Sequence, residues 1–279
     1  MEKTPPGPEN GRQPGQARER FGTMQLIIRK NNRIDVLDAL RGIAILAMVF
    51  YHGMYDLCDI FNVNIPLFSF LTVLEPPFAG LFILLAGTSS RFSHSNVRRG
   101  LRVLAFGMIV TAVTMLFTRI FGSDQSIYFG ILHFMGCAIL LFEPVRLLAD
   151  RIPRKVALPL WLALFAVTYL MPQAGYIGFP GWHLALPASL FSTPWLFPLG
   201  FPSANFFSAD YFPMIPWFFL FLAGTVIGLP IRERRLPEKF YTARIPFFAT
   251  AGRNTLLIYV LHQPVIYGLL TLLFTLLHR

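Results

Sequence analysis

The sequence predicts an all-α fold: a polytopic membrane bundle of about seven transmembrane helices with a cytoplasmic N-terminus. Composition predicts the bundle. The mean hydropathy is +0.55, and charged residues make up only 14% of the 279 residues, against roughly 25% in a typical soluble domain. Several stretches also exceed the ~18 apolar residues that mark a spanning helix. They are apolar on all sides, unlike the amphipathic helices of soluble proteins.

Seven spans are expected within a single membrane domain that covers residues 31–279. They are placed at 39–57, 68–90, 101–121, 129–148, 157–173, 211–229 and 253–276. The preceding segment, 1–30, is rich in Pro, Gly and charged residues and lacks the apolar core of a signal peptide. It cannot bury apolar surface, so we expect a disordered tail.

The distribution of basic residues predicts the orientation. Lys and Arg collect in the N-terminal tail and in segments 91–102, 146–155 and 231–244, whereas the long connection 174–210 contains neither. Because cytoplasmic loops are enriched in Lys and Arg, the N-terminus is expected in the cytoplasm and the C-terminus outside. The net charge of +10 therefore reflects topology and attraction to anionic membrane lipids. Nucleic-acid binding is not expected, because the charge is not gathered on one folded face.

The first span carries Arg41 and His52, which are eleven residues apart. Each ionisable residue in a span costs about 2.5 to 3.5 kcal/mol on insertion scales, so such residues persist mainly where a polar cavity needs them. On one helix the two lie roughly 16 Å apart and, after a turn of about 1100°, on nearly the same face. We expect them to contact the two ends of one elongated ligand.

Tyr55 and Asp56 follow His52 at helical spacing, three and four residues later. Asp56 is expected to accept one ring N–H of His52 and to leave the other nitrogen available as a base. In the alternative interpretation, Arg41 extends to the inner surface and Tyr55 and Asp56 simply end the helix at the interface. That alternative leaves His52 unexplained.

The second span contains Glu75 immediately before Pro76 and Pro77. The prolines remove two backbone donors, so we expect a broken helix whose freed carbonyls face a polar cavity. At the inner end, small and hydroxyl residues lead to Arg91, a guanidinium that is suited to a phosphate. A plain helix terminus with a positive-inside arginine is the alternative.

Polar residues also mark the fourth and seventh spans. His133 is expected near the outer membrane surface, Arg253 and Asn254 at the inner surface, and His262 and Gln263 in mid-membrane, just before a proline. A lone histidine on an apolar helix is commonly a packing residue, and that alternative stays open for His133 and His262. The outer connection adds Trp182, His183 and Trp195, followed by Tyr211; such aromatic residues suit either a sugar ring or a membrane interface.

Several sequence blocks resemble a known family. RIDVLDALRGIAILAMVFYH, in which ten residues separate Arg41 from His52, resembles the membrane acyltransferase superfamily that includes acyltransferase-3 proteins. HGMYDL, FAGLFILLAGTSS, GILHFMG, SADYFPMIPWFFLFLAGTVIG and GRNTLLIYVLHQP are similar to blocks of the bacterial branch of the heparan-alpha-glucosaminide N-acetyltransferase catalytic-domain family. Together they cover most of residues 33–270, in the family's order.

The resemblance implies an acyltransferase domain in the bacterial cytoplasmic membrane. It implies transfer of an acyl group, commonly acetyl from cytoplasmic acetyl-CoA, to a hydroxyl or amine of an extracytoplasmic glycan or lipid-linked sugar. It places Arg41 at the coenzyme end and His52 at the chemistry. Two features depart from relatives: the first outer loop, DIFNVNIPLFSF, lacks the candidate catalytic histidine of the lysosomal members, and acyltransferase-3 proteins usually carry more than seven spans.

The resulting hypothesis assigns three groups of residues. The catalytic candidates are His52, Asp56, His133 and His262; the coenzyme-binding candidates are Arg41, Arg91, Arg253 and Asn254; the substrate-binding candidates are Tyr55, Glu75, Gln263 and Tyr211. In this hypothesis His52 removes a proton from the acceptor, while His133 or His262 stabilises the oxyanion or shuttles the proton. Membrane lipids are the expected surroundings, and the oligomeric state stays open, a dimer included.

Two other classes stay open on the sequence alone. A transporter would use the same polar groups at mid-membrane to bind a solute that crosses unchanged, although no inverted repeat is visible. A haem-binding electron carrier would use His52, His133 and His262 as axial ligands. Cys58 and Cys137 lie in or next to different spans without metal-ligand spacing, so we interpret them as packing residues and expect no metal site.

Overall fold

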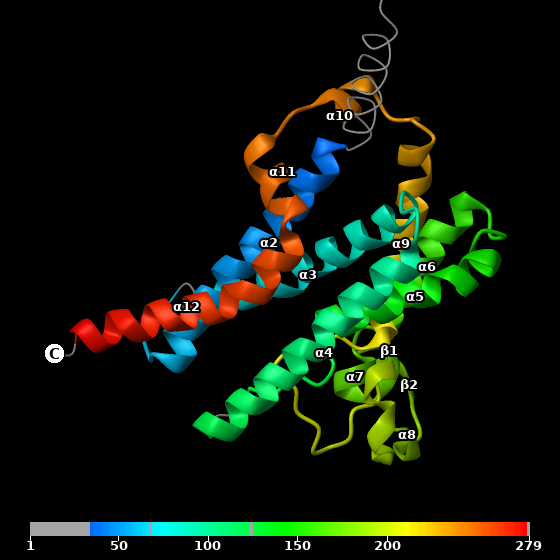
Figure 1. The fold of residues 1–279 in the computed structure, drawn as a ribbon. Helices are drawn as coiled ribbons and strands as arrows, with labels where there is room; N and C mark the ends of the chain where they lie inside the picture. The colour runs from blue at the N-terminus through cyan, green and yellow to red at the C-terminus, as the bar shows by residue number, and fades with distance from the viewer. Residues whose placement is uncertain (1–33, 67, 123–124, 278–279) are drawn as a thin grey trace, which may run out of the picture.

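The computed structural model describes residues 34–66, 68–122 and 125–277, and Figure 1 shows their arrangement. Within these ranges seven helical segments are long and apolar enough to cross a membrane, which confirms the predicted all-α bundle. The long helices are α2 (Asp35–Tyr55), α3 (Phe68–Ser90), α4 (Asn96–Phe121), α5 (Ile131–Ala149), α6 (Arg154–Thr168), α9 (Met214–Arg232) and α12 (Thr255–Leu277). The expected tail at 1–30 lies outside the described residues.

Shorter elements complete the two ends of the bundle (Figure 1). A π-helical turn, η1 (Asp56–Ile60), continues α2. One end carries α7 (Met171–Ala174), the antiparallel hairpin of β1 (Tyr176–Phe179) and β2 (Trp182–Ala185), α8 (Ala188–Ser192) and the 3-10 helix η2 (Pro194–Leu199). The other end carries α10 (Glu238–Thr242) and α11 (Pro246–Arg253).

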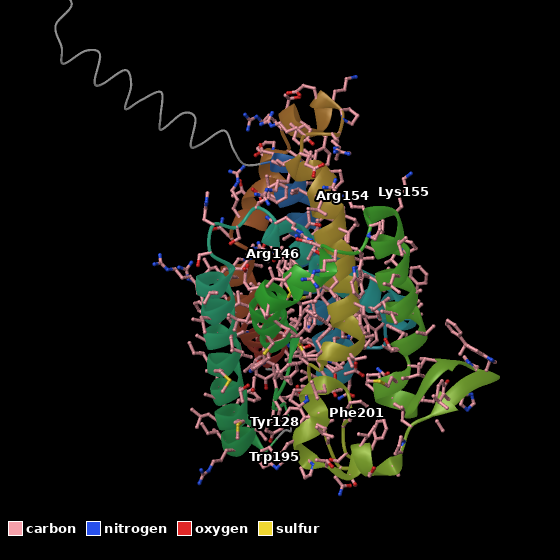
Figure 2. All side chains as sticks on the ribbon, turned by 90° about the vertical axis from the view of Figure 1, so that its right-hand side faces the viewer. Tyr128, Arg146, Arg154, Lys155, Trp195 and Phe201 are labelled. Atoms are coloured by element: carbon pink, nitrogen blue, oxygen red, sulfur yellow. The ribbon has the colours of Figure 1, made fainter. Side chains whose placement is uncertain are left out.

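Basic and aromatic side chains separate between these ends. In Figure 2, Arg146, Arg154 and Lys155 lie toward one end of the bundle, whereas Trp195 and Phe201 lie toward the other. The Trp195 side chain is 82% exposed. The predicted orientation rests on this separation of the basic residues from the uncharged, aromatic end.

Glycines bring α3 and α9 into close contact. A Cβ at Gly87 would lie 2.0 Å from the carbonyl oxygen of Phe221, and one at Gly224 would lie 2.1 Å from that of Leu84. No side chain fits at such distances, so the two backbones are in direct contact. Small residues drive helix association in membranes in this way, because lipid supplies no hydrophobic force between helices.

The buried core lies around α5 and α9. Phe134, Phe142, Ile139 and Phe221 are fully buried there. In contrast, Thr255 is the one buried residue within α12, which packs mainly along α2. The core therefore holds one half of the bundle together, while α12 lies at its periphery.

The predicted break at Pro76 and Pro77 is wrong, because α3 runs as one helix from Phe68 to Ser90 and contains both prolines. Two carbonyls one turn earlier lose their backbone donors, but the helical hydrogen bonds before and after that turn remain. Membrane helices tolerate such prolines where neighbouring groups satisfy the freed carbonyls.

Candidate active site

The candidate site lies between α2 and α12, where two histidines meet. The ring centroids of His52 and His262 are 5.0 Å apart, with an interplanar angle of 74°. Nδ1 of His52 is 2.9 Å from the Met48 carbonyl oxygen, and Nδ1 of His262 is 2.6 Å from that of Tyr259. A carbonyl only accepts, so each neutral ring carries its proton on Nδ1 and presents Nε2 as a bare acceptor.

Asp56 completes the centre of this cluster. Its side chain is fully buried, and its Oδ1 accepts a hydrogen bond of 2.8 Å from the Gln263 amide nitrogen. This hydrogen bond between Gln263 and Asp56 joins α12 to η1.

The predicted hydrogen bond between Asp56 and His52 is absent from the described contacts. His52 instead reaches back one turn to Met48, because helical side chains lean toward the helix N-terminus. Asp56 begins the π-helical turn, and its carboxylate meets α12 instead of the preceding turn of α2. The two residues are near neighbours without being bonded partners.

Three buried polar atoms of the cluster have no hydrogen-bond partner in the described chain: Asp56 Oδ2, Gln263 Oε1 and His262 Nε2. Each such atom costs on the order of 1–3 kcal/mol when left unpaired. Together with Nε2 of His52 they form an acceptor-only surface. A ligand that offers several O–H or N–H donors would satisfy it, and unpaired buried groups of this kind call for such an explanation.

A small cavity opens beside this cluster. It has a volume of about 170 Å³ and is lined by Ala47, Phe50, Tyr51, Leu74, Glu75 and Phe78. Tyr51 and Glu75 both line this cavity, and the Tyr51 ring centroid is 5.6 Å from that of His52. Glu75 thus shares a cavity with Tyr51, the chain neighbour of His52.

Two residues that the sequence analysis did not assign extend the cluster toward α5. The Tyr259 hydroxyl donates to Asp210 Oδ2 at 3.0 Å, and the Ile131 backbone N–H donates to the same oxygen at 3.0 Å. Burial raises the pKa of the Asp210 carboxyl above its ordinary value. The available signal was that Asp210 is the single charged residue of the outer connection.

Three candidates have other partners. His133 is buried; its Nδ1 accepts the Gly130 N–H at 3.3 Å, and its Nε2 lies 3.0 Å from the Thr111 hydroxyl. The Tyr211 hydroxyl donates to the Phe197 carbonyl at 2.6 Å. Tyr55 is 36% exposed. None of their contacts within the described chain includes His52 or His262.

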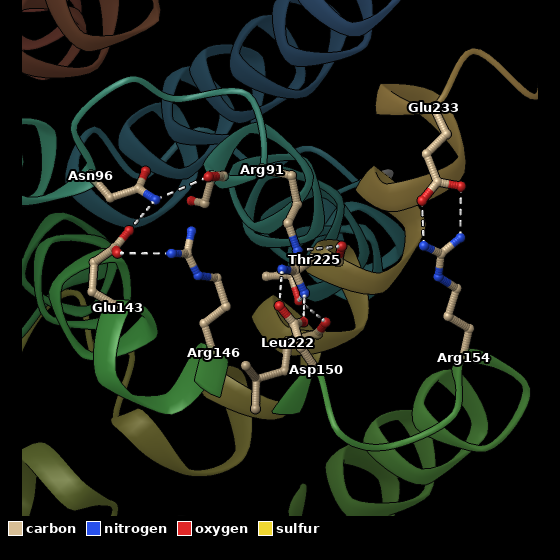
Figure 3. Close-up of polar contacts among 10 residues, drawn as sticks. Arg91, Asn96, Glu143, Arg146, Asp150, Arg154, Leu222, Thr225 and Glu233 are labelled. Carbon is tan, nitrogen blue, oxygen red and sulfur yellow. Dashed lines mark hydrogen bonds and ion pairs between the residues drawn. The ribbon is translucent and has the colours of Figure 1, made fainter. Parts of the chain in front are cut away.

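At the basic end, Arg91 is held on every side (Figure 3). Its Nη1 and Nη2 donate to the Asp150 carboxylate at 2.9 and 2.5 Å, and its Nε donates to the Thr225 carbonyl at 3.1 Å. The guanidinium also lies 5.0 Å from the centroid of the Phe142 ring. These contacts tie α3 to α5 and α9, and they leave Arg91 little capacity for a phosphate.

Arg253 and Asn254 are likewise engaged. Arg253 pairs with Asp35 at 3.0 Å and with Asp38 at 3.6 Å. Asn254 donates to the Thr250 carbonyl of its own helix at 2.9 Å. The arginine thus fixes α11 against the start of α2.

Arg41 and Arg99 both contact serine hydroxyls at the end of α3. Arg41 donates to Asp38 and to the Ser89 hydroxyl. Arg99 lies 3.5 Å from the Ser90 hydroxyl, and no carboxylate pairs with it in the described part of the chain. The sequence analysis counted Arg99 only as a topology signal. Two guanidinium groups beside adjacent serines are a natural contact for a phosphate.

The seven apolar helices and the polar cluster buried between them define a multi-pass integral membrane protein with an intramembrane site. The sequence model of the family described as heparan-alpha-glucosaminide N-acetyltransferase, catalytic, matches residues 33–264. The chain belongs to this family, which confirms the resemblance at family level and makes the protein a membrane acyltransferase. No curated protein and no solved structure gives a significant match.

Proposed function

We propose that this protein transfers an acetyl group from acetyl-CoA to a hydroxyl or amine of a glycan or lipid-linked sugar, with His52 as the general base. The observation that carries the proposal is the acceptor-only cluster of Asp56, Gln263 and the two histidines. Hydroxyls and amines are the acceptor groups that supply the missing hydrogen-bond donors. The same groups are the nucleophiles of acyl transfer.

In the proposed reaction, Nε2 of His52 takes the proton from the acceptor while the acceptor oxygen or nitrogen attacks the thioester carbonyl. A new C–O or C–N bond forms, the C–S bond breaks, and the departing coenzyme A thiolate takes up the proton. His262 Nε2 carries no proton in the tautomer set by Tyr259. It therefore acts as a proton shuttle, and the expected role as an oxyanion donor would require prior protonation.

Arg41 and Arg99 bind the phosphates of acetyl-CoA in this proposal. Their position on the basic end supports it, as does the lack of a carboxylate for Arg99 among the described ion pairs. The positive-inside bias of the loops favours the cytoplasm for this end and the bacterial cytoplasmic membrane as the location. Arg91 and Arg253 then hold the helices that carry the coenzyme site.

Glu75 and Tyr51 hold the acceptor in the cavity beside His52. A carboxylate in a membrane span is costly, and no cation pairs with Glu75 among the described ion pairs. Hydroxyl or amine donors of an acceptor sugar would compensate that cost. The cavity lies between α2 and α3, which suits an acceptor that is delivered at the membrane.

The test uses the purified full-length protein in lipid nanodiscs with radiolabelled acetyl-CoA and a panel of amino sugars and polyols. Wild type should release coenzyme A thiol in step with acetylated acceptor, and His52→Ala should do neither. His183→Ala is the matched control, because His183 lies in the exposed β2 strand against Tyr176. Solute uptake without thiol release would point to a transporter, and a haem absorption band would point to an electron carrier.

A further inference from the structure

Helix α12 depends on few attachments, although it carries half of the histidine pair. Its extensive contacts within the described chain are confined to α2, η1 and α11. Thr255 is its one buried residue. The position of His262 opposite His52 therefore needs a further restraint from the rest of the bundle.

Asp210 supplies such a restraint through a single oxygen. Oδ2 accepts the Tyr259 hydroxyl of α12 at 3.0 Å and the Ile131 N–H at 3.0 Å, at the N-terminus of α5. A carboxylate is favoured at a helix N-terminus, where backbone N–H groups lack partners. A Cβ at Gly130 would lie 2.3 Å from this oxygen, so glycine makes room for the carboxylate.

The restraint continues from Tyr259 to the histidines. The Tyr259 carbonyl lies 2.6 Å from Nδ1 of His262, and the Tyr259 and His262 ring centroids are 5.6 Å apart. His262 in turn faces His52. A chain of contacts thus runs from the N-terminus of α5 through Asp210 and α12 to the proposed base.

We propose that Asp210 and Tyr259 are positioning residues: their hydrogen bond fixes α12 to the α5 half of the bundle and sets His262 against His52. The kinetic consequence rests on the proposed acyl transfer, whereas the attachment of α12 does not. Because a displacement of about 1 Å at a reacting centre can cost 10²-fold in rate, loss of this bond lowers turnover. Binding of coenzyme A phosphates at the opposite end of the bundle is unaffected.

Substitutions of Asp210 can show whether its side chain acts through its hydrogen bonds or through its charge. Both hydrogen bonds end on the same oxygen, so the single amide oxygen of Asp210→Asn can accept both. Asp210→Asn should retain turnover within about 3-fold, whereas Asp210→Ala and Tyr259→Phe should lose about 10-fold or more in kcat with an unchanged KM for acetyl-CoA. A residue that acts through its charge would fail equally as Asn and as Ala.

The experiment compares wild type, these three variants and Tyr267→Phe in nanodiscs. Tyr267 is the matched control, because it lies on the same helix and the described contacts of its side chain are with aromatic rings. Alongside kinetics, hydrogen–deuterium exchange of residues 255–264 should rise in Tyr259→Phe and remain at the wild-type level in Tyr267→Phe. Exchange tests the attachment of α12 even where wild type shows no acetyl transfer, a result that would reject the proposed function alone.

Two results would overturn the inference. The first is a Tyr259→Phe variant with wild-type turnover and wild-type exchange in α12. The second is an Asp210→Asn variant as impaired as Asp210→Ala, since the charge and not the hydrogen bonds would then matter. Should Asp210→Ala fail to fold, Tyr259→Phe still decides, because it keeps the ring and removes only the hydroxyl.

Discussion

The imidazole rings of His52 and His262 lie 5.0 Å apart, edge to face, and the Nδ1 atom of each contacts a carbonyl of its own helix. In two neutral histidines so arranged, each Nε2 is left as a proton acceptor. The fully buried Asp56 adds a third acceptor. The consequences of this arrangement can be tested by substitution.

The two histidines His52 and His133 should respond to replacement in opposite ways. His52→Ala should lower turnover by about 100-fold or more, the usual cost of losing a general base, with little change in thermal stability. His133→Ala should lower stability by about 1–3 kcal/mol, because it leaves the Gly130 N–H without its acceptor, while turnover of the folded protein persists. Thermal unfolding and turnover measured on the same preparations check both. A stable but inactive His133→Ala variant would contradict this assignment.

Arg99 should act on coenzyme binding. Arg99→Gln is expected to raise the KM for acetyl-CoA by one to two orders of magnitude, as expected from losing about 1.5–3 kcal/mol of charged hydrogen bonding, with a smaller change in kcat. Arg41→Gln should act in the same direction. The neighbouring exposed Arg98 provides the control Arg98→Gln. A lowered kcat at unchanged KM for Arg99→Gln would exclude a phosphate contact.

The contact between α3 and α9 should be intolerant of a single methyl group. Gly224→Ala places a Cβ 2.1 Å from the Leu84 carbonyl oxygen, and overpacking of this kind costs about 1–3 kcal/mol. Gly268→Ala on α12 meets nothing within 4 Å, so it should be neutral or slightly stabilising. Thermal unfolding in identical detergent compares the two. Equal stabilities would show that the α3–α9 backbones lie further apart.

Impermeant thiol labelling tests the orientation. In a background without Cys58 and Cys137, a cysteine introduced as Ser95→Cys or Lys239→Cys should be labelled only after the membrane is opened. Asn205→Cys should be labelled in intact cells, because the 174–210 connection lacks Lys and Arg. The reverse pattern would place the Arg41–Arg99 pair on the outer side and remove cytoplasmic acetyl-CoA as the donor.

The sequence predicted the spans well because hydropathy and length suffice to locate a membrane helix. It also selected His52, Asp56, His262 and Gln263 as candidates, since each is costly in an apolar span, but it gave His133 and Tyr211 equal standing, and their contacts lie elsewhere. It did not predict the partner of Asp56, because the π-helical turn that redirects this residue leaves no pattern in the sequence. Helical spacing alone favoured His52 as the hydrogen-bond partner of Asp56.

Long-range contacts were also beyond the sequence. Asp210 and Tyr259 are 49 residues apart along the chain, and only packing brings them together. Arg91 and Arg99 had the same charge signal, and the structure alone separates the one held by Asp150 from the one without a carboxylate among the described ion pairs. The predicted helix break at Pro76 and Pro77 was wrong because neighbouring helices can stabilise a membrane helix that contains prolines.

Because α12 is sparsely packed, its tilt is expected to depend on the thickness of the bilayer. Its 23 residues extend about 35 Å at 1.5 Å per residue, more than the roughly 30 Å of a typical hydrocarbon core. A helix longer than the core tilts, and the tilt follows the local thickness of the membrane. A lipid environment that changes the inclination of α12 is therefore expected to change the separation of the two histidines, and with it the rate of the proposed acyl transfer.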